Sequence, residues 1–234
     1  MRDEKTKEEV ISFWDHHFHN LEAMAKAKSD IVLDTSLDEC LQILGDSCEE
    51  VLDIACGNGL ALIETRLIGG KIKRGLGFDS SKNAIEYANK IVAVSKIDNL
   101  RFEVGDESFL AQINDASYDG IFCSNFLDVI PEEISLMVMG EIKRILKPQG
   151  LLLLKFNFFL TDDLIARLKM EKVGESCYAM NGVFRANNKT TEQWLGLFNG
   201  FEVVKQTGYQ RAPGLPEDRL ILLKKLNNLI LSIS

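Results

Sequence analysis

The chain has 234 residues and a formal net charge of −8, from 27 Lys and Arg against 35 Asp and Glu. This balance argues against nonspecific binding to nucleic acids or anionic membranes, because both depend on an excess of basic side chains. The hydrophobic share of 46% is ordinary for a globular protein, and the length suits one large α/β domain.

The cysteines and the two ends of the chain indicate the cellular compartment in which the protein is expected to reside. The five cysteines are odd in number and none forms a C-x-x-C pair. Residues 1–9 are charged and lack the apolar core of a secretory signal, and no apolar run approaches the roughly 18 residues of a membrane-spanning helix. These features predict a cytoplasmic protein with reduced thiols and no membrane partner. The apolar tail, residues 226–234, offers a surface through which the chain could form oligomers.

The first elements in the chain are predicted to be helical. Apolar and aromatic side chains, including Val10, Trp14 and Leu21, recur at helical spacing within residues 4–28. A second, shorter helix is expected over residues 37–44.

From residue 51 onward, short apolar strands alternate with helices. The expected strands are 51–55, 75–78, 100–104, 118–123 and 151–156, and the expected helices are 60–68, 83–95 and one opened by Pro131. Such alternation predicts a parallel sheet covered by helices on both faces. After a turn at residues 148–150, the continuous apolar run 151–156 is typical of a central strand.

The last part of the chain departs from this alternation. A helix over 162–172, a loop, and a helix opened by Thr190 are expected to come first. Two strands, 201–207 and 219–224, then follow with a turn-rich connection between them. No helix fits in this connection, so the pattern predicts an antiparallel hairpin at the edge of the sheet.

The segment with most chemical information is DIACGNG, residues 53–59, at the carboxyl end of the first expected strand. Ala55, Gly57 and Gly59 allow a tight turn, and the next helix directs its N-terminal N–H groups at a ligand. The segment differs from a dinucleotide-binding loop, because Leu62 stands where the last glycine is expected. The Asp53 carboxylate would repel a pyrophosphate and favour a cationic ligand, such as a sulfonium that carries an amino group.

Polar residues also follow the next three strands. Asp79 ends the second strand, 20 residues after Gly59, where an acid can accept both hydroxyls of a ribose. Asp106 and Glu107 follow the third strand, where a carboxylate can accept the exocyclic amine of adenine. An Asp in this position can instead serve only to cap the next helix. Ser124 and Asn125 end the fourth strand, where a substrate would approach.

These segments resemble the motifs of class I S-adenosylmethionine-dependent methyltransferases. The matching segments, in family order and spacing over about residues 45–160, are VLDIACGNG, GLGFDSS, FEVGDE, YDGIFCSNFLDVI and LKPQGLLLLKF. The resemblance implies a doubly wound, mostly parallel seven-stranded sheet with a C-terminal antiparallel hairpin. It also implies an enzyme that uses S-adenosyl-L-methionine and releases S-adenosyl-L-homocysteine.

The resemblance further implies a role for each cofactor contact. Asp53 would orient the amino group, Asp79 would hold the ribose, and Asp106 with Glu107 would hold the adenine. The remaining implied cofactor contacts are Ala55, Gly57, Gly59, Ser80 and Ser124. Two positions depart from the family pattern, since Ala55 replaces a commoner glycine and Ser80 replaces an apolar residue that often packs on adenine.

Family members often fold their N-terminal region over the cofactor. We therefore expect residues 1–45 to form a helical cap or lid, with Trp14 in it, on a single methyltransferase domain, residues 46–234. All three histidines lie in this region, and His17 is a candidate general base. His16 and His19 could ligate a metal together, but no further ligand signature completes such a site, and no metal is predicted.

The acceptor is expected to be a small molecule, with Trp14, Asn125, Tyr178 and Arg185 as candidate contacts. The alternatives are an RNA- or protein-directed methyltransferase, a dinucleotide-dependent oxidoreductase, and a non-catalytic S-adenosylmethionine-binding module. Nucleic acid is disfavoured, because residues 124–127, Ser-Asn-Phe-Leu, lack the Asn/Asp-Pro-Pro-aromatic motif of amino-methylating nucleic-acid enzymes. The sequence leaves open the accepting atom and the use of a general base.

Overall fold

The computed structural model describes residues 11–12, 15–16, 18–19 and 21–227. The helices are α2 (Ser36–Ser47), α3 (Leu60–Ile68), α4 (Lys82–Val94), α5 (Glu132–Ile145), α6 (Asp162–Arg167) and α7 (Thr191–Leu197), with the 3-10 helices η1 (Lys28–Asp30) and η2 (Glu107–Gln112). The strands are β1 (Glu50–Ile54), β2 (Arg74–Asp79), β3 (Leu100–Val104), β4 (Tyr118–Ser124), β5 (Leu146–Phe156), β6 (Glu171–Lys172), β7 (Cys177–Met180), β8 (Val183–Asn187), β9 (Phe201–Tyr209) and β10 (Asp218–Lys225).

The main sheet has seven strands in the order β3-β2-β1-β4-β5-β10-β9. The first five strands are parallel, whereas β10 runs antiparallel to both β5 and β9. The order reverses at β1 and β4, and the carboxyl ends of the strands at such a switch point form the usual ligand site. The predicted fold class, including the hairpin at the sheet edge, is confirmed.

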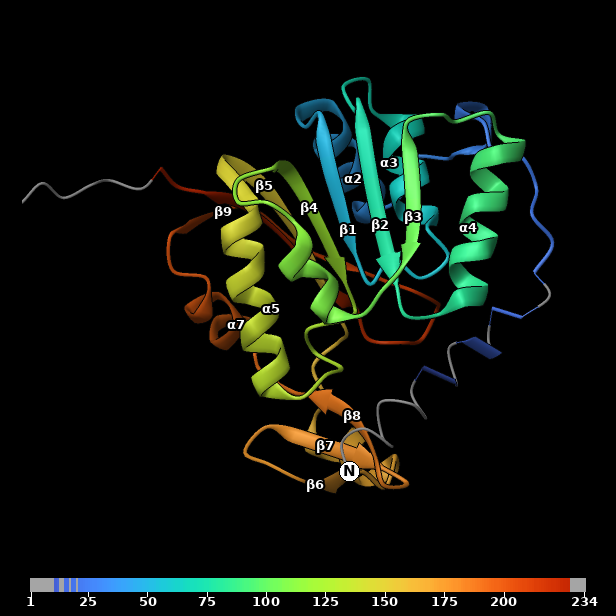
Figure 1. The fold of residues 1–234 in the computed structure, drawn as a ribbon. Helices are drawn as coiled ribbons and strands as arrows, with labels where there is room; N and C mark the ends of the chain where they lie inside the picture. Colours follow the sequence, from blue (N-terminus) through green and yellow to red (C-terminus); the bar gives the residue numbers. More distant parts are fainter. Residues whose placement is uncertain (1–10, 13–14, 17, 20, 228–234) are drawn as a thin grey trace, which may run out of the picture.

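Helices cover both faces of this sheet (Figure 1), and this explains why four consecutive leucines, residues 151–154, occur in β5. Its alternate side chains enter two separate cores: Leu152 and Leu154 pack in the core with α5 and α7, and Leu153 packs in the core with α2, α3 and α4. A strand that is buried on both faces has no solvent side on which polar residues would be favoured.

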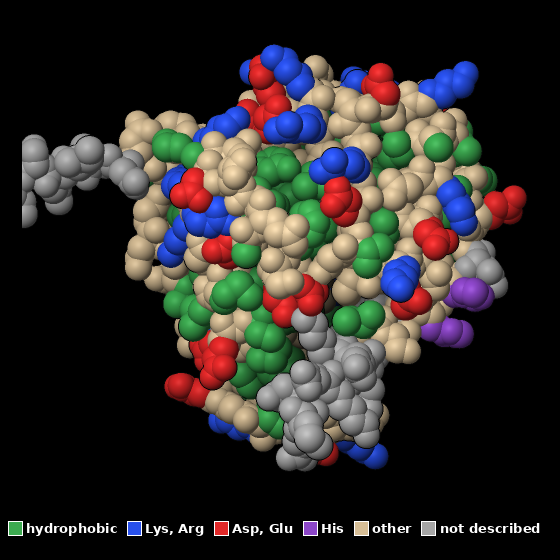
Figure 2. Space-filling model, viewed as in Figure 1, with side chains coloured by type: hydrophobic (Ala, Val, Ile, Leu, Met, Phe, Trp, Pro, Cys, Tyr) green, Lys and Arg blue, Asp and Glu red, His purple; other side chains and the backbone are tan. Residues whose placement is uncertain are grey.

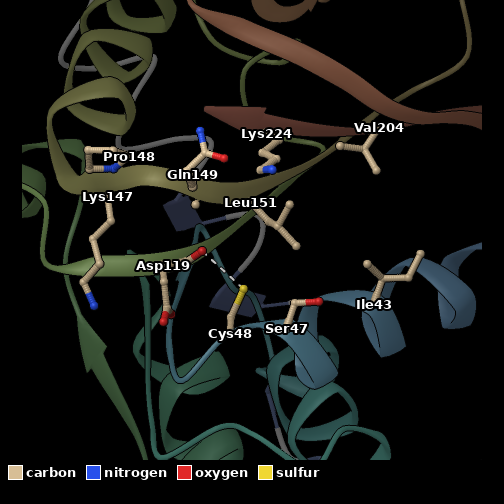
Figure 3. Close-up of a pocket in the computed structure, with 11 residues that line it drawn as sticks. Ile43, Ser47, Cys48, Asp119, Lys147, Pro148, Gln149, Leu151, Val204 and Lys224 are labelled. Carbon is tan, nitrogen blue, oxygen red and sulfur yellow. Dashed lines mark hydrogen bonds between the residues drawn. The ribbon is translucent and has the colours of Figure 1, made fainter. Parts of the chain in front are cut away.

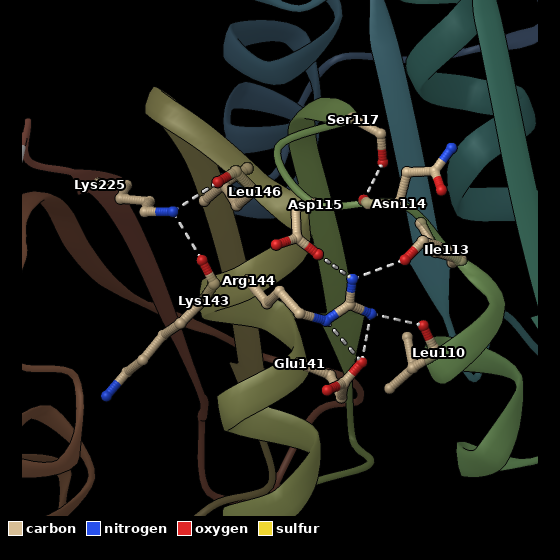
Figure 4. Close-up of polar contacts among 10 residues, drawn as sticks. All are labelled: Leu110, Ile113, Asn114, Asp115, Ser117, Glu141, Lys143, Arg144, Leu146 and Lys225. Atoms are coloured by element: carbon tan, nitrogen blue, oxygen red, sulfur yellow. Dashed lines mark hydrogen bonds and ion pairs between the residues drawn. The ribbon is translucent and has the colours of Figure 1, made fainter.

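Polar contacts connect α5 to the segments beside it (Figure 4). The Arg144 guanidinium donates to the carbonyl oxygens of Leu110 and Ile113 and pairs with the carboxylates of Asp115 and Glu141. Nearby, Lys225 Nζ at the end of β10 donates to the carbonyls of Lys143 and Leu146, each over 2.6 Å. These bonds satisfy carbonyl groups at the carboxyl end of α5, which a helix leaves without partners.

The predicted helix over residues 4–28 is wrong in its second half. Residues 11–12 and 15–16 are helical, but residues 21–27 have no regular secondary structure. The N–H of Lys26 donates to Ser95 Oγ over 2.8 Å, and Lys28 Nζ donates to the Ile68 carbonyl over 3.0 Å. Helix propensity amounts to only tenths of a kcal/mol per residue, so these contacts with the ends of α4 and α3 override it.

Two expectations in the second half of the chain are also corrected. The predicted helix over 162–172 ends at Arg167, and Lys169 adopts a left-handed conformation with φ 53°. The last residues of the predicted helix form β6, which pairs with β7 in a separate antiparallel sheet of order β6-β7-β8. Strands β7 and β8 of this sheet lie where a loop was expected. The turn expected at residues 148–150 is an irregularity within β5, whose register against β4 shifts there.

Candidate functional site

The acids after β1, β2 and β3 lie along one edge of the sheet. Asp53 is opposite Gly77 in the parallel pair of β1 and β2, and Asp79 is opposite Val104 in the pair of β2 and β3. The carboxyl ends of these strands therefore bring Asp53 and Asp79 close together, and Asp106 follows two residues beyond the end of β3.

The Asp53 carboxyl is almost completely buried, with 1% of the residue exposed, and its Oδ2 has no hydrogen-bond partner among the described residues. Burial raises the pKa of this carboxyl well above its ordinary value, and the negative charge of Asp79 raises it further. An unpaired buried oxygen of this kind costs about 1–3 kcal/mol. A cationic or hydrogen-bond-donating ligand at this edge would remove that cost.

The turn after β1 is held in a conformation that favours small residues. Ala55, Gly57 and Gly59 have φ values of 54°, 52° and 73°, all in the left-handed region. A Cβ on Gly59 would lie 2.6 Å from the Phe102 ring, so no side chain fits there. The N–H of Cys56 donates to the Phe78 carbonyl over 3.0 Å, which ties the turn to β2. The turn thus exposes backbone where a ligand can approach closely.

Asp79 links this turn to the start of α4. Its Oδ2 accepts the N–H of Gly57 and its Oδ1 accepts the N–H of Ser81, each over 2.9 Å. Burial raises the pKa of Asp79, although the N–H groups of Ser81, Gly57 and Ser80 partly lower it. The carboxylate is therefore fixed in direction at the position predicted to contact a ribose.

Asp106 is the predicted site residue with the most evident structural role. Its Oδ1 accepts the N–H of Ser108 over 3.0 Å and the Ser108 hydroxyl over 2.6 Å. Asp106 is thereby the N-cap of η2, which begins at Glu107. The contact with adenine proposed for Asp106 and Glu107 stays a prediction.

The segment that precedes α2 reaches this edge of the sheet. Asp15 Oδ1 accepts the Ser81 hydroxyl and the N–H of Asn83, each over 2.9 Å, at the N-terminus of α4. A Cβ on Gly57 would lie 3.7 Å from Cζ of Phe18, so the Phe18 ring lies over the glycine-rich turn. Trp14 and His17 lie outside the described residues. His16 and His19 are exposed, with ring centroids 6.5 Å apart.

The predicted acceptor residues lie in two places. Asn125 directly follows β4, and its Oδ1 accepts the hydroxyl of Ser124, the predicted cofactor contact that ends β4, over 3.1 Å. Tyr178 on β7 and Arg185 on β8 are partly buried in the separate small sheet. Figure 1 shows this small sheet beyond the carboxyl ends of the parallel strands, at the same end of the molecule as the glycine-rich turn.

Sequence reasoning missed a buried basic residue beside Asn125. Lys155, near the end of β5, is 7% exposed and pairs with Asp218, which is fully buried. The available signal was a single Lys after four leucines in an otherwise apolar strand, because Lys is almost never fully buried unless it is paired.

A pocket of about 400 Å³ lies elsewhere, at the amino end of β5 (Figure 3). In it, Cys48 Sγ donates to the Asp119 carbonyl over 3.2 Å, and Lys147 and Lys224 contribute to the lining. The predicted cofactor residues do not line this pocket, which is at the opposite end of the parallel strands.

Over the described part of the chain, no group of three or more His, Cys, Asp or Glu side chains could hold a metal ion. None of the described helices is both long and apolar enough to cross a membrane.

A family profile described as "Methyltransferase domain" matches residues 46–200, well over half of the chain. The uncharacterised RP028 protein of Rickettsia prowazekii (strain Madrid E) is 27% identical over 113 residues, which make up 46% of this chain and only 42% of that relative.

Solved structures share the fold. The PH0226 protein of Pyrococcus horikoshii OT3 has a TM-score of 0.63 and 21% identity, over 81% of this chain and 88% of its own. A SAM-dependent methyltransferase from Methanosarcina mazei has a TM-score of 0.62 and 22% identity, over 78% of this chain and 93% of its own. The family profile spans most of the chain, and the chain belongs to the methyltransferase domain family.

Proposed function

We propose that this chain is an S-adenosylmethionine-dependent methyltransferase that acts on a small-molecule acceptor. The observation that carries the proposal is the position of the N-terminal segment, in which Asp15 binds the start of α4 and Phe18 lies over Gly57. A covered glycine-rich turn favours an acceptor that is small enough to be enclosed, and it disfavours a bulky polymer. Of the expected cap of residues 1–45, we accordingly propose that the part before α2 forms a lid on the domain of residues 46–234, whereas α2 itself packs in the core of that domain.

The residues at this edge fit the cofactor. When bound, S-adenosylmethionine supplies a methyl group that its positive sulfonium has already activated. The unpaired Oδ2 of Asp53 is suited to the amino group of a cationic ligand, and the backbone at Gly57 and Gly59 leaves room for close approach. The fixed carboxylate of Asp79 is suited to ribose hydroxyls. Because the donor is already activated, the protein contributes mainly orientation, which can be worth about 7–11 kcal/mol.

The surface charge supports a small acceptor over a nucleic acid. On the face shown in Figure 2, basic and acidic side chains lie interspersed, whereas phosphate backbones are bound by clustered Lys and Arg. The alternatives are an RNA- or protein-directed methyltransferase and a non-catalytic cofactor-binding module.

We also propose a cytoplasmic location. All five cysteines are free thiols, the state expected in a reducing compartment. Oligomer formation through the tail likewise stays a prediction, because residues 228–234 lie outside the described residues.

Two measurements test the proposed function. Calorimetric titration of S-adenosylmethionine should show binding, and failure of a folded protein to bind near millimolar cofactor would count against the proposal. Transfer of a radiolabelled methyl group from the cofactor should then appear in a small-metabolite extract and not in separate RNA or protein fractions. Label in either polymer fraction would favour that alternative, and binding without transfer would favour the non-catalytic module.

A further inference from the structure

The pocket at the amino end of β5 lies apart from the glycine-rich edge of the sheet. Leu151 on β5, Val204 on β9 and Lys224 on β10 line it from the sheet, and Ile43 on α2 and Cys48 directly after α2 line it from the helix side. Figure 3 shows these residues around one hollow, with Val204 and Ile43 on the same side of it. The volume of about 400 Å³ is within the range of pockets that hold ligands, roughly 300–1,000 Å³. The pocket is thus large enough to take several side chains of a bound segment.

The pocket marks a place where one face of the main sheet is incompletely covered. On the other face, Phe201 and Leu223 pack in the core with α5 and α7. On the α2 face, Val204 is 49% exposed, although it lies on the strand next to β10. Apolar side chains on a sheet face are normally covered, because their contact with water is unfavourable. The α2 face at this corner of the sheet therefore offers an apolar surface that a further segment could cover.

The described part of the chain ends at the rim of this pocket. Gln149, which also lines the pocket, donates its Nε2 to the carbonyl of Lys225, the last residue of β10, over 3.4 Å. The N–H of Leu226 then donates to the Gly200 carbonyl over 2.8 Å. Both edges of β10 are occupied, by β5 and by β9, so residues 228–234 cannot pair with β10. At about 3.3 Å per residue these residues can span about 23 Å, a reach that includes the adjoining pocket.

Residues 228–234, Asn-Leu-Ile-Leu-Ser-Ile-Ser, contain no charged side chain. Successive side chains of an extended segment point to opposite faces. One face would then be wholly apolar, and it consists of Leu229, Leu231 and Ile233. The other face holds Ile230 between an asparagine and two serines. This pattern indicates an extended segment that is buried on one face, and the two asparagines at 227–228 favour a turn before it.

We propose that residues 228–234 turn back over this pocket and bury the face formed by Leu229, Leu231 and Ile233 against its apolar lining. The driving force is the removal of apolar surface from water, and the entropy cost of ordering the segment opposes it. The segment of the same chain is favoured over that of a second copy, because a short flexible connection gives an effective concentration in the millimolar range. The pocket lies at the opposite end of the parallel strands from the predicted cofactor residues, so this inference does not depend on the proposed function.

A thiol placed in the pocket tests this docking. The rate at which a maleimide labels Val204→Cys is compared between the full chain and a chain that ends at Asn227, and peptide mass spectrometry separates this label from any on the native cysteines. We expect labelling to be about fivefold or more slower in the full chain, since a segment that is docked about four-fifths of the time leaves the thiol open only for the rest. Equal rates in the two chains would overturn the inference.

The neighbouring valine provides a matched control. Val203 is 50% exposed, against 49% for Val204, but it lies opposite Leu223, which packs in the core with α5 and α7. Labelling of Val203→Cys should therefore proceed at the same rate in both chain lengths. If removal of residues 228–234 accelerated labelling at both positions alike, the segment would be stabilising β9 as a whole, and docking in the pocket would be overturned.

Point substitutions test the docked face without shortening the chain, so the test holds even where the shorter protein does not fold. In the full-length Val204→Cys protein, Leu231→Ser should raise the labelling rate about threefold or more. Ile230→Ser removes a similar apolar side chain from the other face and should leave the rate within about twofold. An equal effect of the two substitutions, or no effect of either, would overturn the proposal.

Dilution distinguishes docking within one chain from docking between two copies. Protection of Val204→Cys should be the same at about 1 and about 100 μM protein, because an intramolecular contact does not depend on concentration. Protection that disappears at the lower concentration would overturn docking within one chain and would indicate that the segment of a second copy occupies the pocket.

Discussion

The N–H of Gly57 donates to Asp79 Oδ2 over 2.9 Å, and this bond joins the glycine-rich turn after β1 to the end of β2. The other oxygen of the same carboxylate accepts the N–H of Ser81, at the start of α4. One side chain thus fixes both the turn and the neighbouring helix terminus. A ligand that binds Asp79 meets a carboxylate whose direction is already set, so little of its binding energy is spent on ordering the site.

Replacing Asp79 should therefore weaken cofactor binding strongly. In Asp79→Asn the side chain loses its charge and one of its two acceptors, so we expect the dissociation constant to rise about tenfold or more. Titration calorimetry with S-adenosylmethionine measures this directly. The matched control is Asp115→Asn, an exposed residue that pairs with Arg144, and its affinity should be unchanged. Equal affinity of Asp79→Asn and wild type would contradict the assigned role.

Asp53 should show opposite effects on stability and on binding. Its pKa is raised by burial, so the stability of the free protein declines as the pH rises from the ordinary Asp pKa through the raised value. Asp53→Asn removes the free-energy cost of burying a negative charge at this position. We therefore expect the variant to have a higher unfolding temperature than the wild type at neutral pH without cofactor. The same variant should bind the cationic cofactor more weakly, by about tenfold or more.

The pH dependence of binding supplies an independent check on Asp53. In the wild type, affinity for S-adenosylmethionine should fall as the pH is lowered through the raised pKa, because the protonated acid no longer attracts a cation. In Asp53→Asn this part of the dependence should disappear. Scanning calorimetry and titrations across the acidic to neutral range measure both effects. A variant that is less stable than wild type at neutral pH would refute the reading of Asp53 as a strained, unpaired acid.

Ala55 should be a position where glycine is better than the native residue. Its φ of 54° is left-handed, a conformation that costs a residue with a Cβ about 1–2 kcal/mol. Ala55→Gly should stabilise the protein by about 0.5–1 kcal/mol after the greater chain entropy of glycine is subtracted. Urea unfolding measures the change. Ala61→Gly, within α3, is the control and should be destabilising by a similar amount, because there the helix needs no left-handed residue.

Asp15 should control how firmly the N-terminal segment is held. Hydrogen bonds from Asn83 and Ser81 lower the pKa of Asp15, so the contact is present above the ordinary Asp pKa and is lost as the pH falls through the lowered value. Asp15→Ala should speed both proteolysis of the N-terminal segment and cofactor dissociation severalfold at neutral pH. Asp34→Ala, at an exposed position in the following segment, should change neither rate. If Asp15→Ala matched the wild type in both rates, the lid proposal would fail.

The sequence determined the parts of this protein that depend on local pattern. The alternation of strands and helices from residue 51 onward predicted the parallel sheet, and α3 (Leu60–Ile68) lies where its apolar spacing placed it. The glycine-rich turn and Asp79 were found in the same way, because strand ends at one edge of a parallel sheet must converge. The family followed from five motifs in order.

The tertiary structure decided which distant side chains meet. Lys155 and Asn125 are 30 residues apart, and Asp15 and Ser81 are 66 residues apart, so no local periodicity links them. Contacts with α3 and α4 kept residues 21–27 out of a helix, and pairing with β7 drew Glu171 and Lys172 into a strand. Propensity is weak beside such contacts, because a few hydrogen bonds outweigh differences of tenths of a kcal/mol per residue.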